Sequence, residues 1–139
     1  MAQQIREVMT PNPITLPATA TALDAAKAMR EADVGDIVVL ENSRICGIVT
    51  DRDIVVRSVA TGGNPAQTKL GDICSRELAT VSPTDEVQEA IALMKDKAIR
   101  RLPVVENDRP VGVVSLGDLA VERDRRSALG EISAAPPNR

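Results

Sequence analysis

Two copies of one short stretch decide the fold of this 139-residue chain: Gly47-Ile48-Val49-Thr50-Asp51-Arg52-Asp53 and Gly112-Val113-Val114-Ser115-Leu116-Gly117-Asp118. The shift between them is 65 residues (112 − 47), and it aligns residues 8–55 with residues 73–120 without a gap. Eleven aligned pairs are identical, where ordinary composition predicts about three. The chain is therefore two copies of one unit. A unit of about fifty residues rarely buries enough surface alone, so we expect the copies to pack on each other.

Each copy predicts the same order of elements, β-α-β-β-α. Apolar runs at 37–40 and 45–49, and again at 102–105 and 111–114, flank polar residues and predict hairpins. A helix is expected before each hairpin, with Thr19 and Thr84 as candidate N-caps, and a brief strand around 14–16 or 79–81 before that helix. A short helix is expected after Thr50 and after Ser115. The fold class is thus α+β, two tandem repeats with pseudo-two-fold symmetry: residues 5–58, a linker at 59–69, residues 70–122 and a tail at 123–139.

Composition excludes several functions. The chain has no His and no Phe, Tyr or Trp, so it lacks the commonest general base and metal ligand and any aromatic surface for stacking bases. We therefore expect no enzyme activity and no metal site. The net charge of −3 argues against nucleic acid as a partner. No stretch reaches the roughly 20 apolar residues of a membrane helix, and no signal peptide precedes the first repeat, so we expect a cytoplasmic protein that does not bind membranes.

The repeated stretch resembles the CBS domain pair, also called the Bateman module. The resemblance covers residues 5–122 and includes Val8-Met9-Thr10-Pro11 and Ile99-Arg100-Arg101-Leu102-Pro103-Val104. It implies a small stand-alone regulatory module that binds AMP, ADP, ATP or a related adenosyl ligand between its two repeats, with no other cofactor. It also implies a homodimer and a protein partner that the sequence does not identify. The Ala-rich segment 22–28 predicts a helix face that allows close approach between two copies.

Two candidate clefts follow from the resemblance. The first cleft combines the Thr/Asp motif of the first repeat with residues of the second repeat. Its residues are Thr50, Arg52, Asp53, Thr80, Val81, Arg100 and Arg101. The second, expected to bind more weakly, combines Thr15, Leu16, Gly35, Asp36, Ser115 and Asp118. Guanidinium groups suit phosphate, whereas the carboxylate of Asp36 repels it.

The Thr/Ser-x-x-Asp spacing has two interpretations. A carboxylate at the start of a helix can accept hydrogen bonds from the vicinal hydroxyls of a ribose. The same spacing also fits a capping box, in which hydroxyl and acid only close the helix end. If both motifs were caps alone, the chain would be a structural protein–protein interaction module without a ligand.

The two cysteines, Cys46 and Cys74, align with the apolar residues Val111 and Met9. This alignment predicts reduced packing residues in preference to a redox switch.

Overall fold

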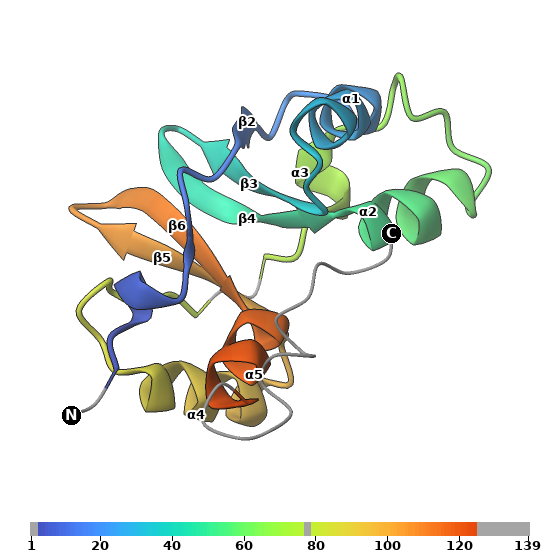
Figure 1. The fold of residues 1–139 in the computed structure, drawn as a ribbon. Helices are drawn as coiled ribbons and strands as arrows, with labels where there is room; N and C mark the ends of the chain where they lie inside the picture. Colours follow the sequence, from blue (N-terminus) through green and yellow to red (C-terminus); the bar gives the residue numbers. More distant parts are fainter. Residues whose placement is uncertain (1–2, 77–78, 125–139) are drawn as a thin grey trace. The chain divides into compact units, whose positions relative to one another are not determined.

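The computed structural model describes residues 3–76 and 79–124, without the side chains of 121–124. Most of the predicted tail, 123–139, therefore lies outside the described residues. The chain folds into two compact units, each coloured by its place in the sequence in Figure 1. Unit 1 contains the chain up to Pro11, Ala79–Glu106 and the chain from Val111; unit 2 contains Asn12–Leu78 and Asn107–Pro110.

Unit 2 holds most of the first repeat. Its elements are β2 (Thr15–Pro17), α1 (Ala22–Ala32), β3 (Asp36–Glu41), β4 (Arg44–Thr50), α2 (Asp51–Ile54), the π-helix η2 (Val55–Val59) and α3 (Leu70–Ile73). The sheet order is β2-β3-β4, with β2 parallel and β4 antiparallel to β3. Residues from α1 and α3 pack with alternate residues of β3, and Figure 1 shows both helices beside this sheet. The core contains Ala22, Ala25, Met29, Ile37, Val39, Val49, Ile54, Leu70, Ile73 and Cys74.

Unit 1 repeats this plan in the second half of the chain. Its elements are the 3-10 turn η1 (Ile5–Glu7), β1 (Thr10–Pro11), α4 (Val87–Lys97), β5 (Arg101–Glu106), β6 (Arg109–Ser115, whose first two residues belong to unit 2) and α5 (Leu116–Asp124), and its sheet order is β1-β6-β5. Val81 bridges Val104 in parallel, as β2 pairs with β3 in unit 2. The core contains Ile5, Val81, Ala90, Met94, Leu102, Val104, Val114 and Leu119.

The first residues of each repeat pack onto the other repeat. Thr10 of β1 pairs with Val113 of β6, and Ile5 is fully buried in the core of unit 1. In unit 2, the Ser75 N–H donates to the Ile48 carbonyl at 2.9 Å, and the Ile48 N–H donates back at 3.2 Å. Thr10 and Ser75 are aligned positions of the two repeats, so the exchange is reciprocal. Neither the N-terminal turn and strand nor α3 was predicted from the sequence.

The predicted helix starts need correction. The N-cap of α1 is Thr21, whose hydroxyl accepts the Asp24 N–H, and the residue before α4 is Glu86, which makes no side-chain cap. Thr19 and Thr84 lie two residues earlier in each case and are exposed. Of the Ala-rich segment, Ala22 and Ala25 are fully buried in the core of their own unit, so only the partly buried Ala26 and Ala28 remain for the expected contact with a second copy.

Candidate functional site

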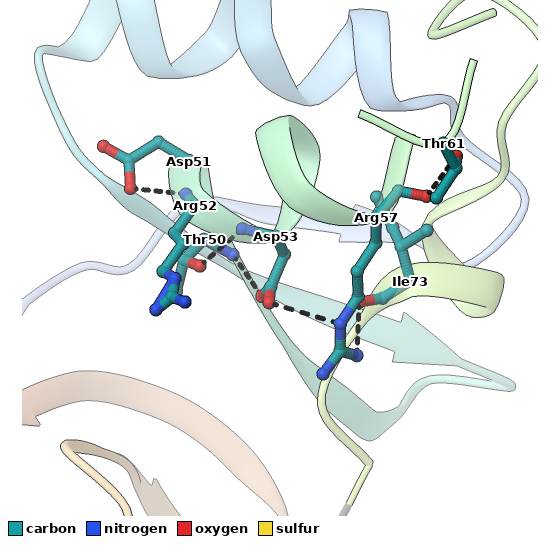
Figure 2. Close-up of polar contacts among 7 residues, drawn as sticks. All are labelled: Thr50, Asp51, Arg52, Asp53, Arg57, Thr61 and Ile73. Carbon is teal, nitrogen blue, oxygen red and sulfur yellow. Dashed lines mark hydrogen bonds and ion pairs between the residues drawn. The ribbon is translucent and has the colours of Figure 1, made fainter. Parts of the chain in front are cut away.

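The first motif lies where β4 ends and α2 begins. The Thr50 hydroxyl accepts the Asp53 N–H at 3.1 Å, and Asp53 Oδ2 accepts the Thr50 N–H at 2.9 Å. Two otherwise unpaired N–H groups of the helix start are thereby satisfied. Figure 2 shows these two bonds side by side, with the Asp53 carboxylate directed back to the Thr50 backbone at the end of β4. The capping interpretation of the spacing is therefore confirmed for this motif, although it uses only one carboxylate oxygen.

The second oxygen of Asp53 has a neighbour that sequence reasoning missed. Arg57 Nε lies 3.8 Å from Asp53 Oδ1, and Arg57 Nη1 donates to the Ile73 carbonyl at 3.2 Å (Figure 2). The Asp53 side chain is 17% exposed, so solvent still reaches the carboxylate. The signal was the i,i+4 spacing of an acid and an arginine on one helix. Arg57 links the motif to the end of α3, because Ile73 is the last residue of that helix.

The second repeat has the same cap. Asp118 Oδ2 accepts the Ser115 N–H at 3.0 Å, and the Ser115 hydroxyl accepts the Asp118 N–H at 3.0 Å. Position 122, which aligns with Arg57, is a glutamate in the sequence. The two motifs thus have the same cap. They differ one helical turn later, where the first has a basic residue and the second an acidic one.

A third cap of this kind lies outside the motifs. Thr21 and Asp24 make the same pair of bonds at the start of α1, at 2.9 and 3.1 Å. The hydrogen bond from the Thr21 backbone, followed by that from its side chain, lowers the pKa of the Asp24 carboxyl. Cap geometry alone therefore does not mark a binding site, and Thr21–Asp24 provides a matched control for the two motifs.

Two of the other candidates of unit 2, Gly35 and Asp36, are backbone neighbours of the first motif. Gly35 accepts the Asp51 N–H through its carbonyl at 3.1 Å, and Asp36 is the strand partner of Thr50. Thr15 is exposed on β2, whereas Leu16 is partly buried against the core. Arg52 is exposed, and in Figure 2 its guanidinium lies on the far side of Thr50 from Arg57.

The candidates of unit 1 lie at the start of β5 and on the segment that bridges this strand. The Arg100 carbonyl accepts the Leu116 N–H at 2.8 Å, and Arg101 begins β5. Thr80 is exposed, but the Val81 side chain is 4% exposed within the core. The Val81 N–H and carbonyl both bond β5, to Pro103 and Val105. Each predicted cleft combines residues of both units, so the clefts themselves stay predictions.

Two further findings concern the described residues. They contain no group of three or more His, Cys, Asp or Glu side chains that could hold a metal ion. Within the same part of the chain, no helix combines the length and the apolar character that crossing a bilayer requires.

Two β-α-β-β-α repeats, each with a Gly-apolar-apolar-Thr/Ser-x-x-Asp motif between its last strand and helix, define a tandem-repeat protein of the CBS type. The family model for the CBS domain matches residues 5–59 and 70–124, and the chain belongs to this family. The chain is similar to the CBS domain-containing protein YhcV of Bacillus subtilis, with 36% identity over 126 residues that cover 91% of this chain and 89% of YhcV.

Solved structures show the same fold. A crystal structure of Hypoxic Response Protein I with two coordinated zinc ions has a TM-score of 0.74 and 30% identity, covering 85% of this chain and 97% of that one. The CBS domain pair of the protein MJ0100 has a TM-score of 0.80 at 20% identity, covering 91% and 100% of the two chains. The second likeness shows the fold alone.

Proposed function

We propose that this chain is a regulatory module that binds an adenosyl ligand, AMP, ADP, ATP or a related compound, through the Thr50–Asp53 motif. The observation that carries the proposal is that the two oxygens of the Asp53 carboxylate have different partners. Oδ2 closes the helix start, whereas the contact that Oδ1 makes within the described residues is a long one, to Arg57 at 3.8 Å, and the side chain is 17% exposed. A ribose offers two adjacent hydroxyl donors, and a charged acceptor binds them more strongly than a neutral one.

The cap contributes to binding by fixing the carboxylate. The hydrogen bond from the Thr50 N–H restrains the Asp53 carboxylate through Oδ2, so less side-chain freedom is lost when a ligand binds. The Asp53 side chain is partly exposed, so a ligand can reach it while part of the solvent is excluded. Thr50, which supplies both a hydroxyl and an N–H to the cap, is a positioning residue in this proposal.

The rest of the proposed residue set comes from the family resemblance. Arg100 and Arg101 are the phosphate-binding groups, with Thr80 beside them, and Val81 adds no side-chain contact because its side chain lies in the core. Arg52 belongs to the same set. The sister set around Ser115 and Asp118 takes Thr15, Leu16, Gly35 and Asp36; its carboxylate at position 36 disfavours phosphate.

Ligand preference and regulation follow from the difference between the two residue sets, one with two arginines and the other with a carboxylate. Asp53 should matter for adenosine and its phosphates alike, and the two arginines only for the phosphates. Bound ligand favours the conformation that binds it better, and a partner protein that reads this conformation is regulated by population shift. MJ0100, which has the same fold, was crystallised with 5′-methylthioadenosine and S-adenosyl-L-methionine. We expect no catalytic step in this function.

The test is calorimetric titration of the full chain with adenosine, AMP, ADP and ATP. Asp53→Asn keeps an oxygen that can accept the Thr50 N–H but removes the charged acceptor. We expect it to weaken every ligand by about tenfold or more, as for loss of a charge-assisted hydrogen bond. Replacing Arg100 and Arg101 by Ala should weaken ADP and ATP and leave adenosine nearly unchanged.

Asp24→Asn is the matched control, because it disturbs the same cap geometry away from the motif. It should lower stability as much as Asp53→Asn and leave affinity unchanged. Equal affinity in the wild type and Asp53→Asn would contradict the proposal. Absence of binding by all four ligands would favour the alternative, a structural protein–protein interaction module.

Self-association completes the proposal: we expect a homodimer. The large apolar side chains that stay exposed include Val55, Val56 and Val59 on η2, and burying them against a second copy removes apolar surface from water. Light scattering at tens of micromolar should give twice 14.8 kDa. A monomer mass would rule this out without bearing on ligand binding.

A further inference from the structure

The two cysteines, 28 positions apart in the chain, meet in unit 2. Cys46 Sγ and Cys74 Sγ are 3.9 Å apart. Cys74 is 5% exposed in the core, whereas Cys46 is partly exposed and also lies 3.7 Å from Glu41 Oε2. A bond between the sulfurs needs a separation of about 2.05 Å.

An irregularity in β4 places Cys46 on the core face. Val39 pairs with Gly47 and Leu40 with Ile45, so Cys46 is an extra residue on its strand. Regular alternation would turn Cys46 to the same face as Ile48, away from the Val49 side of the sheet. A β-bulge re-aims a side chain in this way. The bulge therefore directs Cys46 toward the cluster that contains Cys74.

The exchanged segment carries Cys74 to this place. The paired hydrogen bonds between Ile48 and Ser75 hold the two strands together one residue beyond Cys74. Gly47 allows the close approach, because a Cβ there would lie 2.9 Å from Cys74 Sγ and would collide with the Ser75 carbonyl. In unit 1 the aligned positions are Met9 and Val111, and Met9 Sδ lies beside Gly112. The backbone arrangement is shared, but only unit 2 has two thiols.

The two thiols differ in reactivity. Burial, and next the neighbouring Cys46, raise the pKa of the Cys74 thiol to about 11, against a smaller opposing effect of Arg76. Arg76 also faces Glu41 at 3.8 Å. Because the thiolate is the nucleophile, the more accessible Cys46 is the thiol that meets a reagent first, and buried Cys74 is positioned to react second.

We propose that Cys46 and Cys74 are a modification site that forms a reversible disulfide within one chain by exchange with a small-molecule disulfide such as oxidised glutathione. The Cys46 sulfur, after losing its proton, attacks one sulfur of glutathione disulfide and releases one glutathione thiolate. The Cys74 sulfur, also deprotonated, attacks the Cys46 sulfur of the mixed disulfide and releases the second. The two protons end on two glutathione thiols. Two electrons pass from the cysteines to the S–S bond of the reagent, and the step runs backward with excess reduced glutathione.

The experiment exposes the reduced full chain to oxidised glutathione and traps free thiols with N-ethylmaleimide in acid. Trypsin cuts after Arg44, Arg52, Lys69 and Arg76, so the disulfide joins peptides 45–52 and 70–76. We expect this joined pair to exceed the glutathione adduct by about tenfold or more, because the second thiol is already adjacent. Reduced glutathione should restore both free peptides. The same oxidation in denaturant should lose most of this preference.

Two variants separate the roles of the sulfurs. Cys74→Ala should stop at the glutathione adduct of Cys46, and Cys46→Ala should leave Cys74 unmodified until the protein is unfolded. If a variant does not fold, the wild-type peptide map still decides the question. A stable glutathione adduct on wild-type Cys46, or disulfides only between chains, would overturn the proposal.

Discussion

At the scale of single residues, Cys74 couples the fold to alkaline pH. Burial and the proximity of Cys46 raise the pKa of its thiol from 9.0 to about 11, while Arg76 acts in the opposite direction and Glu41 faces Cys46 from the neighbouring strand. Above pH 9 the unfolded chain therefore loses the Cys74 proton, which the folded chain retains up to about pH 11. Folding binds the proton more tightly, so this contribution to stability is complete below pH 9 and is lost as pH rises through 11.

We predict that the free energy of unfolding falls by about 2 kcal/mol between pH 8 and pH 11 through this group alone. Cys74→Val lacks the thiol and should show a shallower fall. Urea unfolding of both proteins, followed by far-ultraviolet circular dichroism under reducing conditions, measures the difference. Curves that run parallel for the wild type and Cys74→Val would show that the thiol ionises without cost to the fold.

The residues of the motifs were predictable, but some of their neighbours were not. The Thr-x-x-Asp spacing predicted the cap, and the structure has that cap in both repeats. Arg57 could have been found from its i,i+4 distance to Asp53. The Cys46–Cys74 contact could not, because it depends on a bulge and on a segment from beyond the repeat. Alternation within a strand predicts the wrong face when one extra residue is inserted.

At the scale of elements, the hairpins were predictable because their apolar runs and polar turns are local signals. The observed strands Asp36–Glu41, Arg44–Thr50, Arg101–Glu106 and Arg109–Ser115 contain the predicted runs. The start of α1 was misassigned because several threonines precede it, and each can act as an N-cap. Thr21 acts as the cap in the structure because Asp24 stands three residues later and completes the capping box.

This correction makes a prediction for α1. Thr21→Ala removes the side chain that accepts the Asp24 N–H and should destabilise the protein by about 1 kcal/mol. Thr19→Ala, at an exposed position, should stay within about 0.5 kcal/mol of the wild type. Thermal or urea unfolding of the two variants side by side checks this. A larger effect at Thr19 would mean that the helix starts where the sequence first suggested.

At the scale of the whole molecule, the reciprocal exchange means that each unit depends on a segment that belongs to the other repeat. The sequence repeat predicted two copies, but it contained no signal that the first residues of each copy would pack on the other. The pattern of apolar residues indicates which segments are buried. It does not indicate which of two similar cores a buried segment joins. Ile5 and Leu70 are both fully buried, in different units.

We predict that Ile5→Ala destabilises the protein by about 2–5 kcal/mol, as for other large-to-small core changes. Hydrogen exchange should quicken in α4 and β5, 80 or more positions along the chain (87 − 5 = 82), before it quickens in α1. Leu70→Ala is the matched change, and its effect should fall on α1 and β3. If Ile5→Ala loosened α1 first, the assignment of the N-terminal segment to unit 1 would be wrong.

The exchange also sets an order of events during synthesis on the ribosome. Every core residue of unit 2 lies between positions 22 and 74, whereas the core of unit 1 needs both Ile5 and Leu119. Translation of the 45 residues between Cys74 and Leu119 (119 − 74) takes about 2–9 seconds at roughly 5–20 residues per second. Ile5 is translated first and buried last. Until Ser75 emerges, the edge of β4 lacks the segment that pairs with Ile48 in the folded chain.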